Sequence, residues 1–388
     1  MPSCLGCPRI CAFAIDASRA PRVRSLPSLV EAQRAALRVS IGLRQLLRDT
    51  KSRRKPIRVD APSAPGRMAA LPIVVAVDVD PDWRIPGASG TPYRGELDWV
   101  GLFKGVPQMV QSVRGLIDSQ GRHVRFTWLL RSDDQIGSIL GDPAFLADRF
   151  AEFWRERLAQ GDEIGWHPHT WRFSERERVW YQEQKDVDWV RECFRDGHRA
   201  LSRHFQIRTA KPGWMYHDNF TMRVFDELGI EADLAAMPGA GYAGKVPGTD
   251  LPLWVYDWLE APQEPYYPSR SNYKRPGAAC LRLLEVPNWT FPLGLIRSVL
   301  HRIRAQSDRD LANPAKFPFL VRRAFTKPPL TVPFVCSFHP EELLGRSLLF
   351  ACRNVFDNMS ALLRVCKQRG IPTRMTVGNE IPPSVRWK

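Results

Sequence analysis

Two aspartates at the end of an apolar run are the first residues that could do chemistry. Residues Ile73–Val77 are small or β-branched and show no polar alternation, which predicts a strand buried on both faces. Asp78 and Asp80 follow, and residues two apart in an extended chain project to the same side. Their carboxylates would therefore converge, and a cation or a shared proton is the usual remedy for the repulsion. The alternative is that one aspartate caps a turn while the other is solvated.

A histidine pair offers the other half of a metal site. A very short strand is expected at Glu163–Gly165, and His167-Pro168-His169 follows it. Extended spacing aims both imidazoles the same way, and the proline stiffens the backbone between them. Two histidines and one aspartate are the three protein ligands that a catalytic zinc keeps when water fills the remaining position. The alternative is a pair of ordinary hydrogen-bonding loop histidines.

The surrounding chain must bring these groups together. From Met68 onward, short apolar runs alternate with longer helical patterns, which predicts a βα barrel or a doubly wound sheet. In a barrel the loops leaving the carboxyl ends of the strands form the working face. The residues that fall at such positions are Asp78, Asp80, Asp134, His167, His169, Lys211 and His339.

The expected elements come from periodicity and from glycine and proline signals. Residues 235–287 are rich in Gly, Pro, Tyr and Trp and are expected to form an elaborated loop region with short strands. The strands expected after the first are Val124–Leu130, Glu163–Gly165, Leu253–Tyr256, Leu281–Val286, Thr331–Phe338 and Thr373–Val377. The expected helices are Val106–Ile117, one from Asp142 to just before Gly161, Asp186–Phe205, Asp218–Leu228, Phe291–Gln306, part of Ala315–Lys327, and Arg346–Arg369.

Four motifs together resemble the polysaccharide deacetylase family, the NodB-homology fold of carbohydrate esterases related to family four. The closer resemblance is to a divergent branch of it with DVD and HxH motifs. The resemblance implies an irregular (β/α) barrel of about seven strands. The motifs lie in family order between Ile73 and Val377, at Ala76–Asp80, Gly161–His169, Lys211–Trp214 continuing through Leu228-Gly229, and Phe338–Leu343.

The resemblance also implies roles for the residues. Asp78 would be the general base and His339 the general acid, while Asp80, His167 and His169 would hold a divalent metal. Zinc is the first expectation for this metal, with cobalt, nickel and manganese as alternatives. Most members space the two histidines four residues apart, a position that Trp171 fills here, and the family arginine is replaced by Lys211, which can still balance the charge of Asp78.

The implied reaction is removal of an N-acetyl or other acyl group from an amino sugar or a surface-polysaccharide precursor. The partner expected is thus a carbohydrate or a small acylated molecule. Asp134 and four aromatic residues, Trp166, Trp171, Trp214 and Tyr216, are candidate substrate-binding residues, with Trp254 and Trp258 as further stacking surface. For the aromatic residues the alternative is ordinary core or loop packing.

Two other classes of function remain open at this point. One is hydrolysis of a non-peptide C–N bond of the ureide or imide type on the same fold. The other is glycan binding by a homologue that has lost catalysis.

Composition limits the partners. The 388 residues are 44% hydrophobic and carry a formal net charge of +15, but residues 1–67 alone hold 14 Lys or Arg against four Asp or Glu. We therefore expect a basic leader at 1–67, which is a disordered arm, a transit segment or sequence upstream of a true start at Met68, followed by one barrel domain at 68–388. Because the charge is concentrated in the leader, nucleic acid is not an expected partner.

Cysteine usage and hydropathy suggest the compartment. Cys4, Cys7 and Cys11 form a CxxC with a third cysteine nearby, but no second ligand cluster of standard spacing follows. The remaining cysteines are scattered among apolar neighbours, as expected for reduced and buried thiols. No apolar run approaches the length of a membrane span. These features favour a cytoplasmic protein of undetermined oligomeric state.

Overall fold

The computed structural model describes residues 70–82, 99–292, 304–306, 311–312, 316–325, 332–344 and 348–381. All of them lie within one compact unit that spans residues 66–388. The leader at 1–67 and its cysteines lie outside the described residues.

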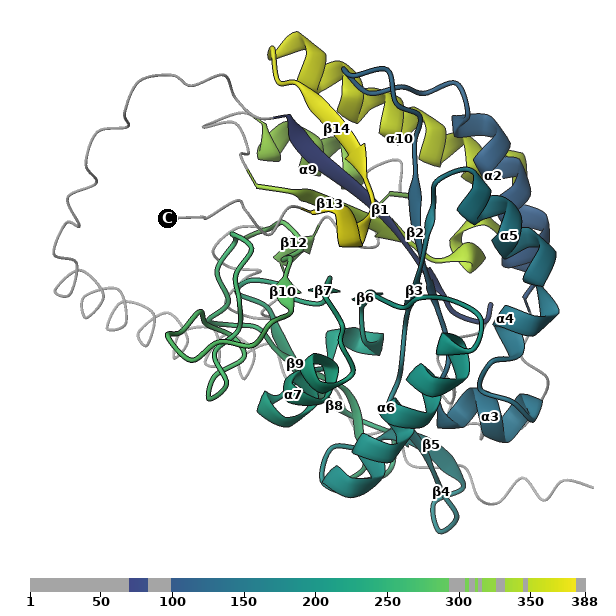
Figure 1. The fold of residues 1–388 in the computed structure, drawn as a ribbon, viewed down its shortest axis with the longest axis vertical. Helices are drawn as coiled ribbons and strands as arrows, with labels where there is room; N and C mark the ends of the chain where they lie inside the picture. The colour runs from purple at the N-terminus through teal and green to yellow at the C-terminus, as the bar shows by residue number, and fades with distance from the viewer. Residues whose placement is uncertain are drawn as a thin grey trace, which may run out of the picture. The chain divides into compact units, whose positions relative to one another are not determined.

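A parallel sheet dominates the described part of the chain and curls into an open barrel (Figure 1). Every pairing between its eight strands is parallel, which confirms the predicted α/β class. The order across the sheet is β10 (Leu284–Glu285), β7 (Ala232–Asp233), β6 (Thr209–Ala210), β3 (Glu163–Trp166), β2 (Phe126–Leu130), β1 (Leu71–Val79) and β13 (Phe334–Phe338), with β14 (Thr373–Thr376) also on β1.

Strand β1 lies at the centre of this arrangement. Its residues Ile73–Val77 pair with β13 along one edge. Along the other edge, residues 71–74 pair with β14 and residues 75–79 with β2, so two strands share that edge in succession. Both faces of β1 are buried, as the apolar run predicted.

Helices cover the outside of the sheet, and α10, α2, α5 and α6 lie outside the strands in Figure 1. Side chains between the sheet and these helices form the larger core, while a smaller core that includes Val74, Ala76, Leu129 and Val335 fills the barrel interior. The helices are α2 (Val106–Val113), α3 (Asp134–Leu140), α4 (Phe145–Arg149), α5 (Ala151–Ala159), α6 (Val187–Ser202), α7 (Asn219–Glu227), α9 (Lys316–Ala324) and α10 (Leu348–Gln368), with short turns η1 (Gly101–Gly105), η2 (Gly213–Met215), η3 (Pro340–Leu344) and η4 (Gly378–Glu380).

Local signals explain where several helices begin and end. Asp218 accepts hydrogen bonds from the backbone of Phe220 and Thr221, and it forms a capping box with Thr221 at the start of α7. Gly229 follows α7 with a left-handed backbone (φ 80°), a conformation that glycine adopts without strain. The predicted bounds Asp218–Leu228 therefore fall within one residue of the observed helix.

Three predictions of local structure were wrong. The segment 291–306 was expected to be helical, yet its described ends form an antiparallel pair, β11 (Thr290–Pro292) with β12 (Arg304–Gln306). The helix expected from Asp142 is two helices, α4 and α5, which break at Phe150. Helix α3 and the antiparallel hairpin of β4 (Trp171–Ser174) with β5 (Val179–Gln182) were not predicted. The strand expected at Leu253–Tyr256 is confirmed as β9 (Pro252–Asp257), which forms a second hairpin with the unpredicted β8 (Gly241–Lys245).

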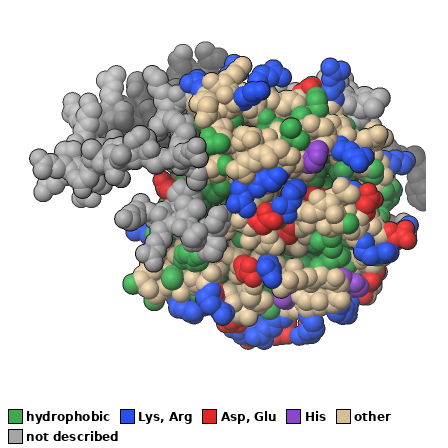
Figure 2. All heavy atoms as spheres, turned by 45° about the horizontal axis from the view of Figure 1, so that its top comes forward, with side chains coloured by type: hydrophobic (Ala, Val, Ile, Leu, Met, Phe, Trp, Pro, Cys, Tyr) green, Lys and Arg blue, Asp and Glu red, His purple; other side chains and the backbone are tan. Residues whose placement is uncertain are grey.

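Charges of both signs are mixed on the surface. On the face drawn in Figure 2, Lys and Arg side chains lie among Asp and Glu side chains. Along α6, for example, Arg191, Arg195 and Arg199 each pair with an acidic residue three positions earlier. None of the described helices is both long enough and apolar enough to cross a membrane.

The cysteines of the described residues are all free. Cys193, Cys336, Cys352 and Cys366 are buried, as expected for reduced thiols, whereas Cys280 is exposed. Burial raises the pKa of the Cys336 thiol to about 12, so it remains protonated at neutral pH.

A cluster of hydrogen-bonded polar groups around Glu163 lies inside the barrel at the amino-terminal ends of its strands. The Glu163 carboxylate accepts hydrogen bonds from the Thr209 and Thr127 hydroxyls at 2.6 and 3.2 Å, and from the Asn379 amide at 3.3 Å. Burial outweighs these bonds and raises the pKa of Glu163 to about 7.

This carboxyl group makes stability depend on pH. The ordinary pKa of Glu is 4.5, so between pH 4.5 and about 7 the folded state keeps a proton on Glu163 that the unfolded chain has released. Protonated Glu163 therefore stabilises the fold at low pH. This contribution is lost as the pH rises through about 7. We expect Glu163→Gln to abolish this dependence. Between pH 5 and 8 the parent should lose about 2–3 kcal/mol of unfolding free energy relative to the variant, measured by urea denaturation. If the unfolding free energies of the parent and of Glu163→Gln changed in parallel with pH, the raised pKa of Glu163 would be contradicted.

Candidate active site

Strand geometry places one group of polar side chains at a single mouth of the barrel. Paired residues of parallel strands share a face, and Ala76 pairs with both Thr127 and Ser337, whose side chains therefore face the interior with it. Side chains alternate between the two faces of a strand, so every second residue along each strand faces the interior. At the carboxyl ends of the strands, six residues are on this side: Asp78, Asp80, Arg131, His167, Lys211 and His339.

The Asp78 carboxylate forms a buried ion pair with Lys211. Lys211 Nζ donates to Asp78 Oδ2 at 2.7 Å and to Ser337 Oγ at 3.3 Å. Burial would raise the pKa of Asp78, but Lys211 and the nearby His167 and His339 outweigh it, and the pKa lies well below its ordinary value. Asp78 Oδ1 has no hydrogen-bond partner among the described residues, so one anionic oxygen is available to accept a proton.

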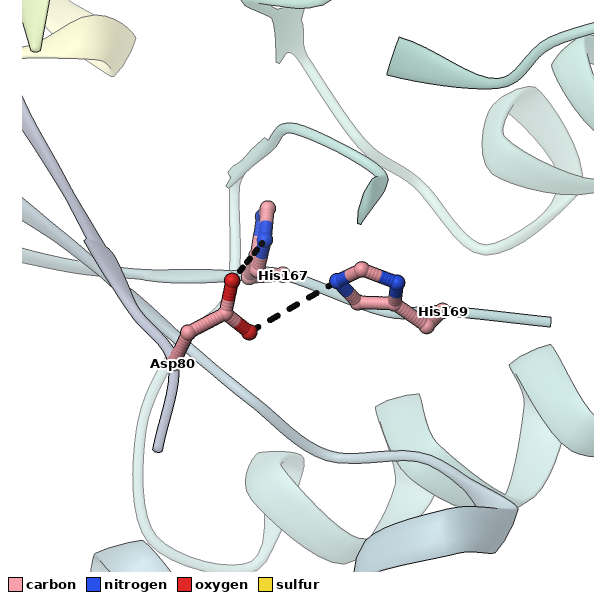
Figure 3. Close-up of side chains that lie close together, drawn as sticks. All are labelled: Asp80, His167 and His169. Atoms are coloured by element: carbon pink, nitrogen blue, oxygen red, sulfur yellow. Dashed lines mark ion pairs between the residues drawn. The ribbon is translucent and has the colours of Figure 1, made fainter. Parts of the chain in front are cut away.

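Asp80, His167 and His169 form the candidate metal site (Figure 3). Nε2 of His167 lies 3.6 Å from Asp80 Oδ2, and Nε2 of His169 lies 3.6 Å from Asp80 Oδ1. One potential ligand atom from each residue lies within 4.8 Å of the others. The Nδ1–H of His167 donates to the Lys211 carbonyl, and this bond fixes the tautomer in which the Nε2 lone pair faces Asp80.

The His169 ring is held in a tight cradle. It stacks on Trp171 at a centroid distance of 5.8 Å, and a Cβ atom added to Gly213 would lie 2.0 Å from His169 Nε2. Burial and the charge of Arg131 lower the pKa of His169 to about 3, so the ring is the neutral imidazole that a metal ligand must be. Its Nε2 is buried with no hydrogen-bond partner among the described residues. An orphaned nitrogen facing a carboxylate fits a bound divalent cation.

His339 closes the site from the other side. Its Nε2 lies 3.5 Å from Asp78 Oδ2 and 3.7 Å from Asp80 Oδ2. On its far side, Nδ1 lies 3.5 Å from Glu342 Oε1, and the backbone N–H donates to Glu342 Oε2 at 3.0 Å. Glu342 therefore orients the ring so that Nε2 faces the two aspartates.

Arg131 and Asp133 also belong to the site, although they were not among the predicted site residues. Arg131 Nη1 donates to Asp80 Oδ1 at 2.9 Å, and its Nε donates to Asp133 Oδ2 at 2.6 Å. Both side chains are buried. The signal in the sequence was an arginine directly after the second buried strand, where a charge needs a buried partner.

Asp134 is not brought to this cluster. It lies in the first turn of α3 and lines a separate cavity of about 330 Å³ between α3 and α6. Burial and the neighbouring Asp133 raise its pKa, whereas the pKa of Asp80 is lowered. The acidic residue after β2 that does reach the site is the preceding one, Asp133.

The predicted aromatic residues divide into two groups. Trp166 is fully buried between the sheet and α6, and its indole donates to the Ser132 carbonyl at 2.9 Å, so it is a core residue and its predicted role in substrate binding is corrected. Trp258 is likewise fully buried and donates to the Met215 carbonyl. Tyr216 is buried and donates to Asp218.

Trp171 and Trp214 contact the ring of His169, and Trp254 contacts Trp214. Trp214 makes edge contacts with the rings of His169, Trp171 and Trp254 at centroid distances of 6.4, 5.3 and 4.8 Å. Trp214 and Trp254 both have left-handed backbones, with φ of 60° and 63°. Such strain is uncommon outside glycine and clusters at functional sites.

Comparison with known proteins adds a structural context. No family model and no curated protein matches the sequence. A provisionally assigned polysaccharide deacetylase from Mycobacterium smegmatis is 16% identical, over 83% of this chain and 99% of its own, with a TM-score of 0.42. A provisionally assigned glycoside hydrolase or deacetylase from Parabacteroides distasonis is 13% identical, over 81% of this chain and 71% of its own, with a TM-score of 0.46.

A third similar structure is a pseudoenzyme of carbohydrate esterase family 4 from Bacillus anthracis. It is 10% identical, over 79% of this chain and 64% of its own, with a TM-score of 0.35. The family that the motifs resemble is thus represented among similar structures, in proteins assigned as deacetylases and in an inactive relative. Similarity at this level of identity describes the fold alone.

The cradle around His169 predicts a strong effect from one methyl group. Gly213→Ala places Cβ against the imidazole, so we expect the ring to be displaced, the fold to lose about 1–3 kcal/mol of stability, and the affinity for Zn²⁺ to fall about 10–100-fold. Calorimetric titration and urea denaturation measure both effects.

The matched control is Gly115→Ala, where the added Cβ meets no atom within 4 Å. It should leave the affinity unchanged. Equal Zn²⁺ affinity in the two variants would contradict the placement of His169 as a ligand.

Proposed function

We propose that the protein is a metal-dependent hydrolase that removes an N-acetyl or other acyl group from an amino sugar or a surface-polysaccharide precursor. The observation that carries the proposal is the convergence of a lysine-paired Asp78, the Asp80–His167–His169 group and the Nε2 of His339 at one barrel mouth. The roles given to these residues below are the ones that the resemblance to the deacetylase family implies.

Asp80, His167 and His169 would hold the divalent ion, and zinc suits a set of two imidazoles and one carboxylate. When bound, such an ion lowers the pKa of water and polarises an acyl oxygen. Cobalt, nickel and manganese are alternatives for the same donors.

Asp78 is suited to act as the general base. Lys211 occupies Oδ2 and keeps the carboxylate anionic, while Oδ1 is unengaged among the described residues and can take a proton from the attacking water. The low pKa of Asp78 ensures that it is ionised at neutral pH.

His339 is suited to act as the general acid. Glu342 holds the ring from behind, so Nε2 faces the reacting volume and can protonate the departing amine. Proton removal and proton delivery thus fall to two different side chains, which sit side by side at 3.5 Å in the structure.

Activity measurements test this assignment. Release of acetate from a panel of N-acetylated sugars should be abolished by a chelator and restored by Zn²⁺. Asp78→Asn should lower kcat at least ~10³-fold while Zn²⁺ binding is kept, because it removes the proton acceptor and leaves Asp80, His167 and His169 in place.

Asp134→Asn is the matched control. It makes the same chemical change at an aspartate that lies outside the cluster, and activity should stay within about twofold of the parent. Full activity in the presence of chelator would contradict the proposal. Turnover of ureides or imides with a dispensable metal would favour the other C–N hydrolase class, and tight glycan binding without turnover would favour an inactive homologue.

A further inference from the structure

A buried arginine contacts the carboxylate that is proposed to bind metal. Arg131 Nη1 donates to Asp80 Oδ1 at 2.9 Å, and its other nitrogens donate to Asp133 and to Gln135 Oε1. The side chain is completely buried. A fixed positive charge beside a cation site is a cost to cation binding, so its presence calls for an explanation.

Asp133 keeps this arginine in place and ties it to the rest of the site. Its two oxygens accept from Arg131 at 2.6 and 3.1 Å. The same carboxylate caps α3 by accepting from the Ile136 amide, and it accepts the His169 backbone N–H at 3.1 Å. One side chain therefore fixes both Arg131 and the backbone of a proposed ligand.

Arg131 and His169 both face the same oxygen of Asp80. Asp80 Oδ1 is 2.9 Å from Arg131 Nη1 and 3.6 Å from His169 Nε2. Any cation held between Asp80 and His169 would thus have the guanidinium as a near neighbour, in a dry environment where charge interactions are strong. The Arg131–Asp133 pair is neutral as a unit, so Asp133 offsets part of this repulsion.

We propose that the Arg131–Asp133 pair sets the divalent-cation affinity of the Asp80–His167–His169 site, with Arg131 lowering the affinity and Asp133 raising it. This inference rests on the proposed metal site and adds the residues that tune it. A site tuned in this way holds a catalytic ion without the tightness of a closed structural site.

Calorimetric titration of the full chain with Zn²⁺, and separately with Mn²⁺, tests the proposal through affinity and not through activity. Arg131→Gln removes the positive charge but keeps a donor for the carboxylates, and it should bind at least ~10-fold more tightly. Asp133→Asn keeps the helix cap but leaves Asp80 as the only carboxylate that balances Arg131, and it should bind at least ~10-fold more weakly.

The double variant Arg131→Gln/Asp133→Asn restores the charge balance, so its affinity should return to within about threefold of the parent. It also leaves neither member of the pair as an uncompensated charge. If Arg131→Gln does not fold, Asp133→Asn and the double variant still give the sign of the charge effect.

A purely structural role predicts a different pattern. In that case all three variants bind more weakly, and the double variant is the weakest, which would overturn the inference. Unchanged affinity in every variant would overturn it as well. A parent that binds neither ion would instead contradict the proposed metal site itself, so the two failures are distinguishable.

Discussion

Two carboxylates, Asp78 and Asp80, are buried two residues apart at the end of one strand, and the rest of the site depends on the charges that make this burial tolerable. An isolated buried carboxylate would take up a proton instead of remaining ionised. Lys211 supplies the opposing charge for Asp78, and Arg131 supplies it for Asp80. Removing either cation would leave an uncompensated buried anion, a loss that typically costs several kcal/mol.

The two aspartates have different surroundings, and this difference divides their chemistry. Asp78 faces a lysine and keeps one unengaged oxygen, which suits proton transfer. Asp80 faces two imidazole nitrogens at 3.6 Å, which suits ligation. Pairs of similar groups in unlike environments are a general way to assign separate roles within one site. Asp80 and Asp133 share the single positive charge of Arg131, so this side of the site keeps a net negative charge that attracts a cation.

Much of this could be predicted from the sequence because parallel strands obey simple rules. The run at Ile73–Val77 indicated a strand buried on both faces, and a period of two then placed Asp78 and Asp80 on one side. The same rule placed His167, Lys211 and His339 at the same mouth. These inferences needed only the local chain and the direction of the strands.

The rest depends on contacts between distant segments, which local patterns do not encode. The hydrogen bond from Arg131 to Asp80 spans 51 residues, and those that Asp162 and Glu163 accept from β2 span 34 to 36. Trp166 was expected to be a stacking residue as one of several aromatic residues, yet the alternation that turns His167 inward turns Trp166 outward into the core. The helical pattern at 291–306 was overridden at its described ends by pairing of β11 with β12.

The most direct test of the central claim is a crystal structure of the protein grown with Zn²⁺ and measured at the zinc absorption edge. We expect one anomalous peak bound by a carboxylate oxygen of Asp80 and the Nε2 atoms of His167 and His169, with Lys211 still paired to Asp78. A peak elsewhere on the molecule, or none at this mouth of the barrel, would contradict it.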